Sequence, residues 1–559
     1  MKNLVVATVI TVITFCGILA LAGCHASPDD AAGQAKELED SVRREYAVTN
    51  LQSIFNNLLV AVKGDRSSPQ YKKYVDSVIG QLVKVYSEHP EDTQNGMKIL
   101  NLLKEIRDPR SLPALIKALD WRSEITEDHA IAAAQTISDI NIPDDKKGEV
   151  VANICRALER VTGARSLDNR MRKIFIETLG DLRDKRATDT LVNVALSQTQ
   201  NQNFLFNILA AQQLTKFADP KTVPAMIKAL YIFDAQNPAM RMNDVAAAAL
   251  VAIGKPSLEP LLQLLKGENE EVNQIVKNYI QAIRQRDAEA AAAMSVPVLV
   301  STEATYALGK LGYREAIDPL IEETKVEDET RRYGAAIALV GINRKDEDTS
   351  RILEAIKKVY DSIDKIKCPQ LLVAMRHLYA DEVMPFFFNV LKTYEFELSP
   401  IRLFAFAGYA FLANKKEIQD LKPFLEKGPV FKERVEMNFP HHEAIIKKTE
   451  ECDENIDCWI ENLRNPDVLI VRKAANAIAR FGRGNEKAID GLIEHLAHSD
   501  LEVRNEILGA IDFIAVKGSK LAVDKIDDLE VREDGRSIWN NFKREALPTR
   551  SRLIIRAGG

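Results

Sequence analysis

Apolar residues recur every three to four positions along most of the chain, which is the spacing of one buried face of a helix. From Glu37 onward almost no stretch shows the strict alternation of a half-buried strand. Val296–Val300 and Leu553–Ile555 are short exceptions, and Pro297 after Ser295 fits the first turn of a helix. The pattern therefore predicts an all-α protein.

The predicted helices repeat. Thr222–Leu230 matches Thr188–Leu196 and Ser257–Leu265 at a spacing of about 35 residues, a period typical of helical repeats. A second element, Val471–Ile478, recurs as Val503–Ala510. Further copies of the first element are Ser111–Leu119, Ala316–Thr324 and Ala488–Leu496. The repeating unit is therefore a pair of helices.

The alternation of Pro-x-Leu-(Ile/Leu)-x-x-Leu with Val-Arg-x-Ala-Ala-x-Ala-(Leu/Ile) and Leu-Gly-x-Leu resembles HEAT repeats. The resemblance covers residues 95–530 and is clearest in 105–345 and 465–515. It implies an α-solenoid, because a helix pair buries its apolar stripe only by stacking on its neighbours. Residues 267–294 break the period and predict an extra or extended helix.

Turn residues mark the predicted units. In HEAT repeats the turn acid and the arginine of the second helix commonly interact from one repeat to the next, and Asp467 with Arg472 and Asp500 with Arg504 match that placement. The alternative is that these arginines are solvated. An acid or amide also precedes a proline at three predicted helix starts, where its side chain would cap free N–H groups: Asp108, Asp219 and Asn465.

The first 24 residues carry a different signal. An apolar run begins at Leu4 and ends in Leu-Ala-Gly-Cys at Cys24, and it resembles a bacterial lipoprotein signal peptide. The resemblance implies cleavage before Cys24 and acyl chains on its thiol and amine. The alternative is an uncleaved membrane-spanning helix over residues 4–21. His25 replaces the aspartate that tends to retain relatives in the inner membrane, which favours the outer membrane.

Together these signals divide the chain into a signal peptide, a lipid-anchored tether, an N-terminal helical segment, the repeat solenoid and a C-terminal cap or tail: 1–23, 24–36, 37–94, 95–530 and 531–559. The chain has 46% hydrophobic and 28% charged residues, as folded proteins do. Its net charge is -6 and no dense Lys/Arg block occurs, so we expect no nucleic-acid partner.

Four cysteines lie beyond the leader and Cys24. An envelope compartment permits disulfides, and the closely spaced Cys452 and Cys458 predict one. The alternative is a zinc site that adds His441 and His442 to these cysteines. We expect Cys155 and Cys368 to be unpaired thiols.

The sequence contains no Walker loop, dinucleotide fingerprint, Gly-x-Ser-x-Gly elbow or His-Glu-x-x-His pair. We therefore expect no catalytic residues, no metal, and no cofactor apart from the lipid on Cys24. His495 and His498 beside Asp500 suggest a polar helix end, with a metal pair as the alternative.

An aromatic cluster is the best candidate for a binding site. It either belongs to a locally aromatic core or forms an exposed partner-binding patch, because large exposed apolar patches mark interaction sites. Its residues are Phe386, Phe387, Phe388, Phe404 and Phe406.

These features predict a non-enzymatic protein-binding scaffold, attached by lipid in the bacterial cell envelope and facing the periplasm or the surface. Its expected partners are other envelope proteins and, through the anchor, the membrane. Two alternatives stay open: an enzyme related to HEAT-like lyases, and a structural envelope component that self-assembles.

Overall fold

The computed structural model describes residues 26–558 except for 122, 124–125, 200–201, 235, 343–345, 394–399 and 534–539. Cys24 and the alternative membrane span at residues 4–21 lie outside the described residues. None of the described helices has both the length and the apolar character that crossing a bilayer requires. The all-α prediction is confirmed, since the described residues include no strand beyond a single bridge between Phe233 and Arg241.

The chain forms two compact units that divide between Thr190 and Leu191. The helices of the first unit are α2 (Ala31–Glu37), α3 (Arg44–Ala61), α4 (Pro69–Glu88), α5 (Thr93–Ile106), α6 (Leu112–Leu119), α7 (Glu127–Asp139), α8 (Asp144–Glu159) and α9 (Ser166–Leu182). The boundary falls within α10 (Thr188–Leu196).

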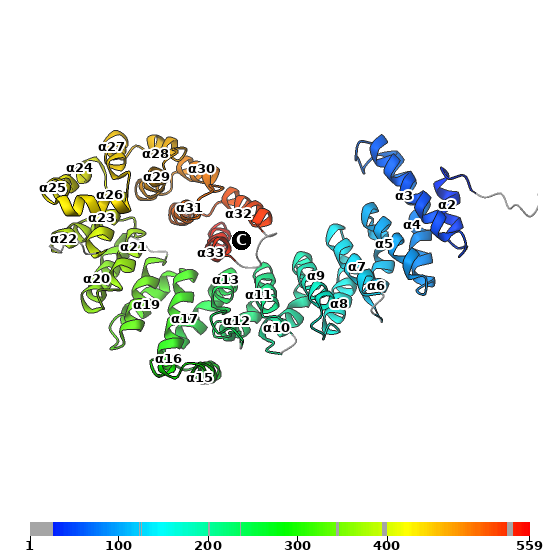
Figure 1. Ribbon diagram of the computed structural model, residues 1–559, viewed down its shortest axis with the longest axis horizontal. Coiled ribbons are helices and arrows are strands. Elements are labelled where there is room, and N and C mark those ends of the chain that lie inside the picture. Colours follow the sequence, from blue (N-terminus) through cyan, green and yellow to red (C-terminus); the bar gives the residue numbers. More distant parts are fainter. Residues whose placement is uncertain are drawn as a thin grey trace, which may run out of the picture. The chain divides into compact units, whose positions relative to one another are not determined.

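Helices of the first unit stack in two layers, as the solenoid prediction requires. In one layer α3 packs on α5, α5 on α7 and α7 on α9, and in the other α4 packs on α6 and α6 on α8 (Figure 1). Stacking therefore begins at α3, and the segment expected at 37–94 is built in the same way as the repeats that follow it.

The stretch that we expected to be a tether contains α2, which packs on α3 and α4. Gln34 is completely buried, and its amide nitrogen donates to the backbone carbonyls of Ala26 and Ser27 at 3.0 and 3.1 Å. The backbone N–H of Ala26 donates to a carboxylate oxygen of Glu37 at 2.7 Å. Ala26 and Ser27 are therefore already part of the fold.

The first helices of the second unit are α11 (Leu205–Phe217), α12 (Val223–Ala229), α13 (Asn243–Ile253), α14 (Leu258–Leu265), α15 (Glu270–Arg284), α16 (Ala288–Ala292), α17 (Val296–Leu311), α18 (Ile317–Glu323), α19 (Glu329–Val340), α20 (Asp346–Ser362), α21 (Cys368–Arg376) and α22 (Met384–Thr393). They are followed by α23 (Pro400–Leu412), α24 (Lys415–Ile418), α25 (Lys422–Lys427), α26 (Pro429–Asn438), α27 (His442–Cys452), α28 (Ile456–Asn462), α29 (Val468–Phe481), α30 (Glu486–His495), α31 (Leu501–Ile514), α32 (Lys520–Glu533) and α33 (Asn541–Arg556). The break predicted at 267–294 is confirmed as the extra helices α15 and α16.

Many first helices of a repeat are preceded by a short 3₁₀ turn whose last residue is buried. These turns are η1 (Pro109–Ser111), η3 (Lys185–Ala187), η4 (Pro220–Thr222), η5 (Lys255–Ser257), η6 (Arg314–Ala316), η7 (Asp381–Val383) and η8 (Gln419–Leu421). The predicted caps Asp108 and Asp219 accept backbone N–H groups at the starts of η1 and η4, at 2.9 and 3.2 Å. Asn465 instead accepts the N–H of Asp467, and Asp467 is the residue that caps α29.

The predicted pairing of Asp467 with Arg472 is wrong. Asp467 instead accepts the backbone N–H of Leu469 at 2.9 Å and so caps the free N-terminus of α29. Arg472 reaches the next repeat and contacts Glu502 and Glu506, at 2.5 and 3.1 Å. Asp500 likewise caps a helix, α31, by accepting the N–H of Val503 at 3.0 Å. The Arg504 guanidinium lies over the ring of Phe542, 5.1 Å from its centroid.

One layer of the second unit closes into a ring. Helices α13, α17, α19, α21, α23, α29, α31 and α33 pack each on the next, and α33 packs back on α13 (Figure 1). The C-terminal helix, expected to be a cap or tail, therefore lies between the two ends of this layer. We call this arrangement the helix ring.

Charged and close-packed contacts hold the closure. Lys310 of α17 forms an ion pair with Glu545 of α33, and Arg552 of α33 contacts Asp512 of α31 at 2.6 Å. At the end of α13, Gly254 has a φ of +79°, and a Cβ there would come within 3.2 Å of Ile555. Closure therefore joins segments that are far apart in sequence.

Helices α17 and α19 approach each other closely at Gly309. A Cβ at Gly309 would lie 2.9 Å from the Cα of Ala338, which is backbone and cannot rotate away. We therefore expect Gly309→Ala to destabilise the protein by about 1–3 kcal/mol, measured by urea unfolding monitored by circular dichroism. Gly80 on α4 is the matched control, because a Cβ there meets nothing within 4 Å. Equal stability of Gly309→Ala and Gly80→Ala would contradict this packing.

Candidate functional site

The helix ring encloses a cavity of about 1040 Å³, which is at the upper end of the sizes usual for small-molecule sites, about 300–1000 Å³. The side chains that line it come from α17, α19, α21, α23, α29, α31 and α33. All of these helices belong to the second unit. The cavity is therefore a product of ring closure.

One wall of the cavity is apolar. It is formed by α19, α21 and α23, together with Phe439 after α26, and consists mainly of small and aromatic residues. Val373 is 36% exposed and Phe404 is half-buried, so the wall presents apolar surface to the cavity. Other residues of this wall are Tyr333, Gly334, Ile337, Ala338, Ala407, Gly408 and Phe411.

Charged side chains lie next to these apolar ones in the cavity lining. Glu506 of α31 is 5% exposed and contacts both Arg376 and Arg472, the latter at 3.1 Å. Both guanidinium groups lie over the ring of Phe411, at 5.0 and 5.5 Å from its centroid. Burial alone would raise the pKa of Glu506, but the charges of Arg376 and Arg472 lower it to about 2. This carboxylate is therefore ionised at neutral pH.

A second charged cluster lies nearer the ring closure. Asp512 of α31 contacts Arg552 and Arg556 of α33, at 2.6 and 3.1 Å. Burial acts to raise the pKa of Asp512, but the two arginines outweigh it and hold that pKa below its usual value. With Lys310, the cavity wall has five cationic side chains against four carboxylates, although the whole chain has a net charge of -6.

His377 borders the cavity and is surrounded by protein. Burial lowers its pKa to about 4, so the imidazole is neutral at physiological pH. Its Nδ1 lies 2.9 Å from the hydroxyl oxygen of Tyr379, whose backbone φ is +46°. Tyr379 also packs against Phe513 of α31, with ring centroids 5.0 Å apart.

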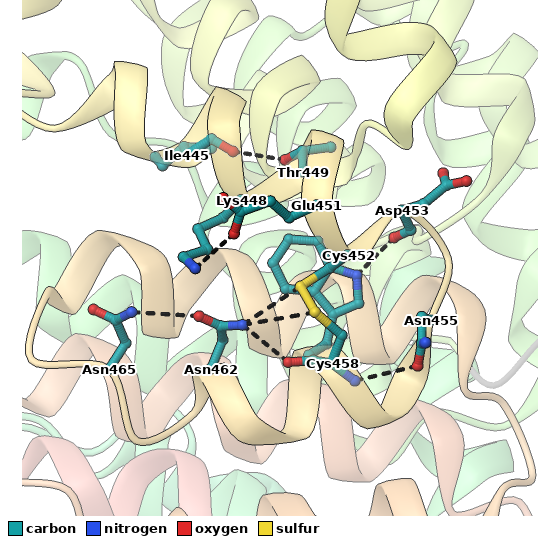
Figure 2. The surroundings of a disulfide bond; sticks show 11 residues. Ile445, Lys448, Thr449, Glu451, Cys452, Asp453, Asn455, Cys458, Asn462 and Asn465 are labelled. Atoms are coloured by element: carbon teal, nitrogen blue, oxygen red, sulfur yellow. Dashed lines mark hydrogen bonds and ion pairs between the residues drawn. A yellow bond between two sulfur atoms is a disulfide. The ribbon is translucent and has the colours of Figure 1, made fainter.

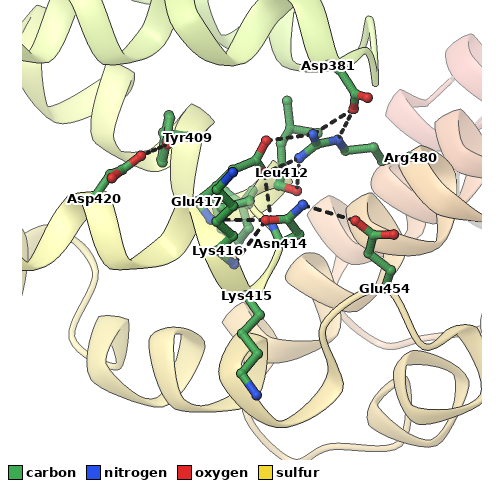
Figure 3. A network of polar contacts seen from close by, with 12 residues as sticks. Asp381, Tyr409, Leu412, Asn414, Lys415, Lys416, Glu417, Asp420, Glu454 and Arg480 are labelled. Atoms are coloured by element: carbon green, nitrogen blue, oxygen red, sulfur yellow. Dashed lines mark hydrogen bonds and ion pairs between the residues drawn. The ribbon is translucent and has the colours of Figure 1, made fainter.

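Two basic side chains of α29, Lys473 and Arg480, hold the C-terminal end of α23, and burial lowers the pKa of Lys473 well below its usual value. Lys473 is completely buried, and its Nζ donates to the carbonyls of Phe411 and Ala413 at 3.1 and 2.6 Å. Arg480 donates to the carbonyl of Leu412 at 2.8 Å (Figure 3). The sequence offers no signal for this role of Lys473, which occupies a variable position of the repeat motif.

Arg480 is itself held by carboxylates from two other segments. Its guanidinium pairs with Asp381 and Glu417, each at 2.7 Å (Figure 3). Glu417 also accepts the backbone N–H of Asn414 at 2.9 Å and so closes a capping box at the start of α24. This network joins α29 to the turns around α22 and α24.

Most of the predicted aromatic cluster is core. Phe387 and Phe406 are at most 1% exposed and Phe386 is 9% exposed, so these three cannot form a surface patch in the folded protein. Phe388 is half-buried and packs against Tyr409 and Phe424. Only Phe404 reaches the candidate site, as part of the apolar wall.

The structure has a disulfide between Cys452 and Cys458 (Figure 2). It joins the end of α27 to α28, next to Trp459, which is completely buried and whose indole N–H donates to the carbonyl of Asp453 at 2.7 Å. Because both sulfurs are bonded to each other, they are not zinc ligands here. Cys155 and Cys368 are free thiols, and both are buried.

The histidines considered as metal ligands have other contacts. His441 contacts Asp467, the Nδ1 of His495 lies 2.8 Å from the carbonyl of Gly491, and His498 accepts the N–H of Asp500 at 3.0 Å. His442 lies near the exposed Glu436 and Glu443. However, the Lys432 ammonium lies 3.6 and 3.7 Å from those carboxylates and already forms ion pairs with both.

Comparison with known proteins supports the repeat. A family model described as a PBS lyase HEAT-like repeat matches residues 302–323, which run from α17 through η6 to α18. The chain therefore contains a HEAT-like repeat. No curated protein matches the sequence. A solved structure of an engineered protein matches 80% of this chain and 98% of its own length at 15% identity, but its TM-score of 0.21 is too low to carry an argument.

Glu506 should make a pH-dependent contribution to stability. Its folded pKa lies below the unfolded value, so the stabilisation is full above about pH 4.5 and is lost as pH falls towards 2. We expect Glu506→Gln to cost about 3 kcal/mol at pH 7, because the buried Arg376 and the half-buried Arg472 lose a charged partner. The difference from wild type should shrink below pH 4.5 in urea unfolding. A difference that stays constant with pH would contradict this assignment.

Proposed function

We propose that this protein is a non-catalytic binding scaffold of the bacterial cell envelope, anchored by acyl chains on Cys24 and binding other envelope proteins through its stacked helices. One observation supports the proposal most strongly. Ala26, two positions after Cys24, already belongs to the fold, because its backbone N–H donates to Glu37 and its carbonyl accepts from Gln34. An acylated Cys24 would hold the helical array close to the lipid surface.

Two or more acyl chains suffice for stable anchoring, since each buried methylene contributes about 0.8 kcal/mol. Stacked helix pairs present continuous surfaces on which a partner can be bound along several repeats. The first of the stacked helices, α3, also leaves apolar side chains uncovered: Tyr46 is 51% exposed and Val60 is 80% exposed. These positions support partner contact at the end of the array that follows the anchor.

Replacing the anchoring cysteine tests the proposal. Cys24→Ser should abolish incorporation of a labelled fatty acid and move the protein out of the membrane fraction. Cys16→Ser is the matched control, because it removes a thiol from the same leader and should change neither result. Acyl labelling that persists in Cys24→Ser would contradict lipid anchoring. Membrane retention without labelling in wild type would favour the uncleaved span at residues 4–21.

The same strains test the binding function. Crosslinking in native membranes, affinity purification and mass spectrometry should recover a reproducible set of envelope proteins from wild type, and a smaller set from Cys24→Ser. Recovery of this chain alone would favour self-assembly. A visible absorbance change on mixing with tetrapyrroles would favour the lyase-type alternative.

A further inference from the structure

The lining of the cavity inside the helix ring combines apolar and charged side chains. Small and aromatic residues come from α19, α21 and α23, and charged groups come from Arg376, Arg472 and the cluster around Asp512. A ligand that fills the space must therefore be amphipathic. If the cavity held only water, its apolar side chains would stay hydrated, which is unfavourable compared with contact to an apolar ligand.

Glycine keeps part of this space open. Gly509 lies within α31, where glycine costs about 1 kcal/mol relative to alanine. Packing does not require it, since a Cβ there would lie 3.5 Å from the Tyr379 hydroxyl and 4.0 Å from Nδ1 of His377, both ordinary contacts. By contrast, a Cβ at Gly408 would lie 2.7 Å from Phe387. A longer side chain at Gly509 would occupy the cavity.

The charged part of the lining has unused hydrogen-bonding capacity. Arg376 is 5% exposed, and one of its terminal nitrogens pairs with Glu506. Its Nε and the side-chain oxygen of the neighbouring Asn505 are buried without a hydrogen-bond partner among the described residues. Buried polar atoms are usually satisfied, and both residues belong to the cavity lining, so their side chains have hydrogen-bonding capacity that the protein does not use.

The sign of the charge follows from the same side chains. Cationic groups outnumber carboxylates by one on the wall, and His377 is neutral. Arginine binds planar anions such as carboxylate through two parallel N–H groups. The ligand's polar end is therefore expected to be an anion.

We propose that this cavity binds a fatty-acid-type amphiphile, with its acyl chain against the wall of α19 and α23 and its single anionic headgroup beside Arg376. The proposal goes beyond the scaffold function and does not depend on Cys24. It can therefore fail while anchoring and partner binding hold, and the reverse is also true.

Binding of cis-parinaric acid, followed by its fluorescence, tests the proposal in the full chain carrying Cys24→Ser, which needs no acyl anchor. We expect saturable binding, and binding of the corresponding alcohol at least about tenfold weaker. Gly509→Leu should weaken binding of the acid at least about tenfold. Gly80→Leu is the matched control, a mid-helix glycine in open space on α4, and should leave binding unchanged.

Arg376→Gln tests the headgroup contact separately, because Arg472 and Asn476 still contact Glu506 in that variant. It should weaken binding of the acid and leave the alcohol unaffected. If Gly509→Leu does not fold, as judged by its melting temperature, the proposal is tested by the Arg376→Gln result and by the preference for the acid over the alcohol. Equal binding by wild type and folded Gly509→Leu, no saturable binding, or equal affinity for acid and alcohol would overturn the proposal.

Discussion

A two-helix unit has too little interior to bury its own apolar face, and this constraint shapes the molecule. Each unit must be covered by the next, so stacking propagates along the chain and leaves an uncovered face at every end. In the second unit that face is covered by the chain itself. Helix α33 lies between α13 and α31, and ion pairs such as that of Lys310 with Glu545 hold it there.

Closure creates the candidate site as a consequence. Side chains that would line an open concave surface instead face one another across an enclosed space. Ring closure brings Glu506 next to Arg376 and Arg472, and the charges of these arginines lower the pKa of that carboxyl despite its burial. The completely buried Lys473 serves the same arrangement by holding the end of α23 in place.

The repeat architecture could be predicted because its signals are local. Periodic apolar positions, the caps at Asp108 and Asp219, and the interruption at 267–294 all act within one or two turns of the chain. Ring closure could not be predicted, since it depends on small rotations that accumulate over many repeats. Its contacts join residues more than two hundred positions apart and leave no spacing signal.

The same distinction, between signals that act locally and contacts that are distant in sequence, holds for individual residues. Arg472 was identified at a repeat position, but its partners are Glu502 and Glu506, while Asp467 caps the local helix N-terminus. The aromatic cluster is evident from composition. Composition does not distinguish a buried aromatic side chain from an exposed one, and Phe387 is buried in the core. The sequence does not indicate a role for Gly509. Its role is apparent only from the structure, in which the absence of a side chain leaves space in the cavity.

Zero-length carbodiimide crosslinking of the native protein, read out by mass spectrometry, tests ring closure most directly. The reagent joins amines to carboxylates that are already in contact, and Lys310 contacts Glu545 only if α33 packs against α17. The account predicts an isopeptide bond between these two residues that is absent from Glu545→Gln. Crosslinks from α33 confined to α31 and α32 would contradict a closed ring.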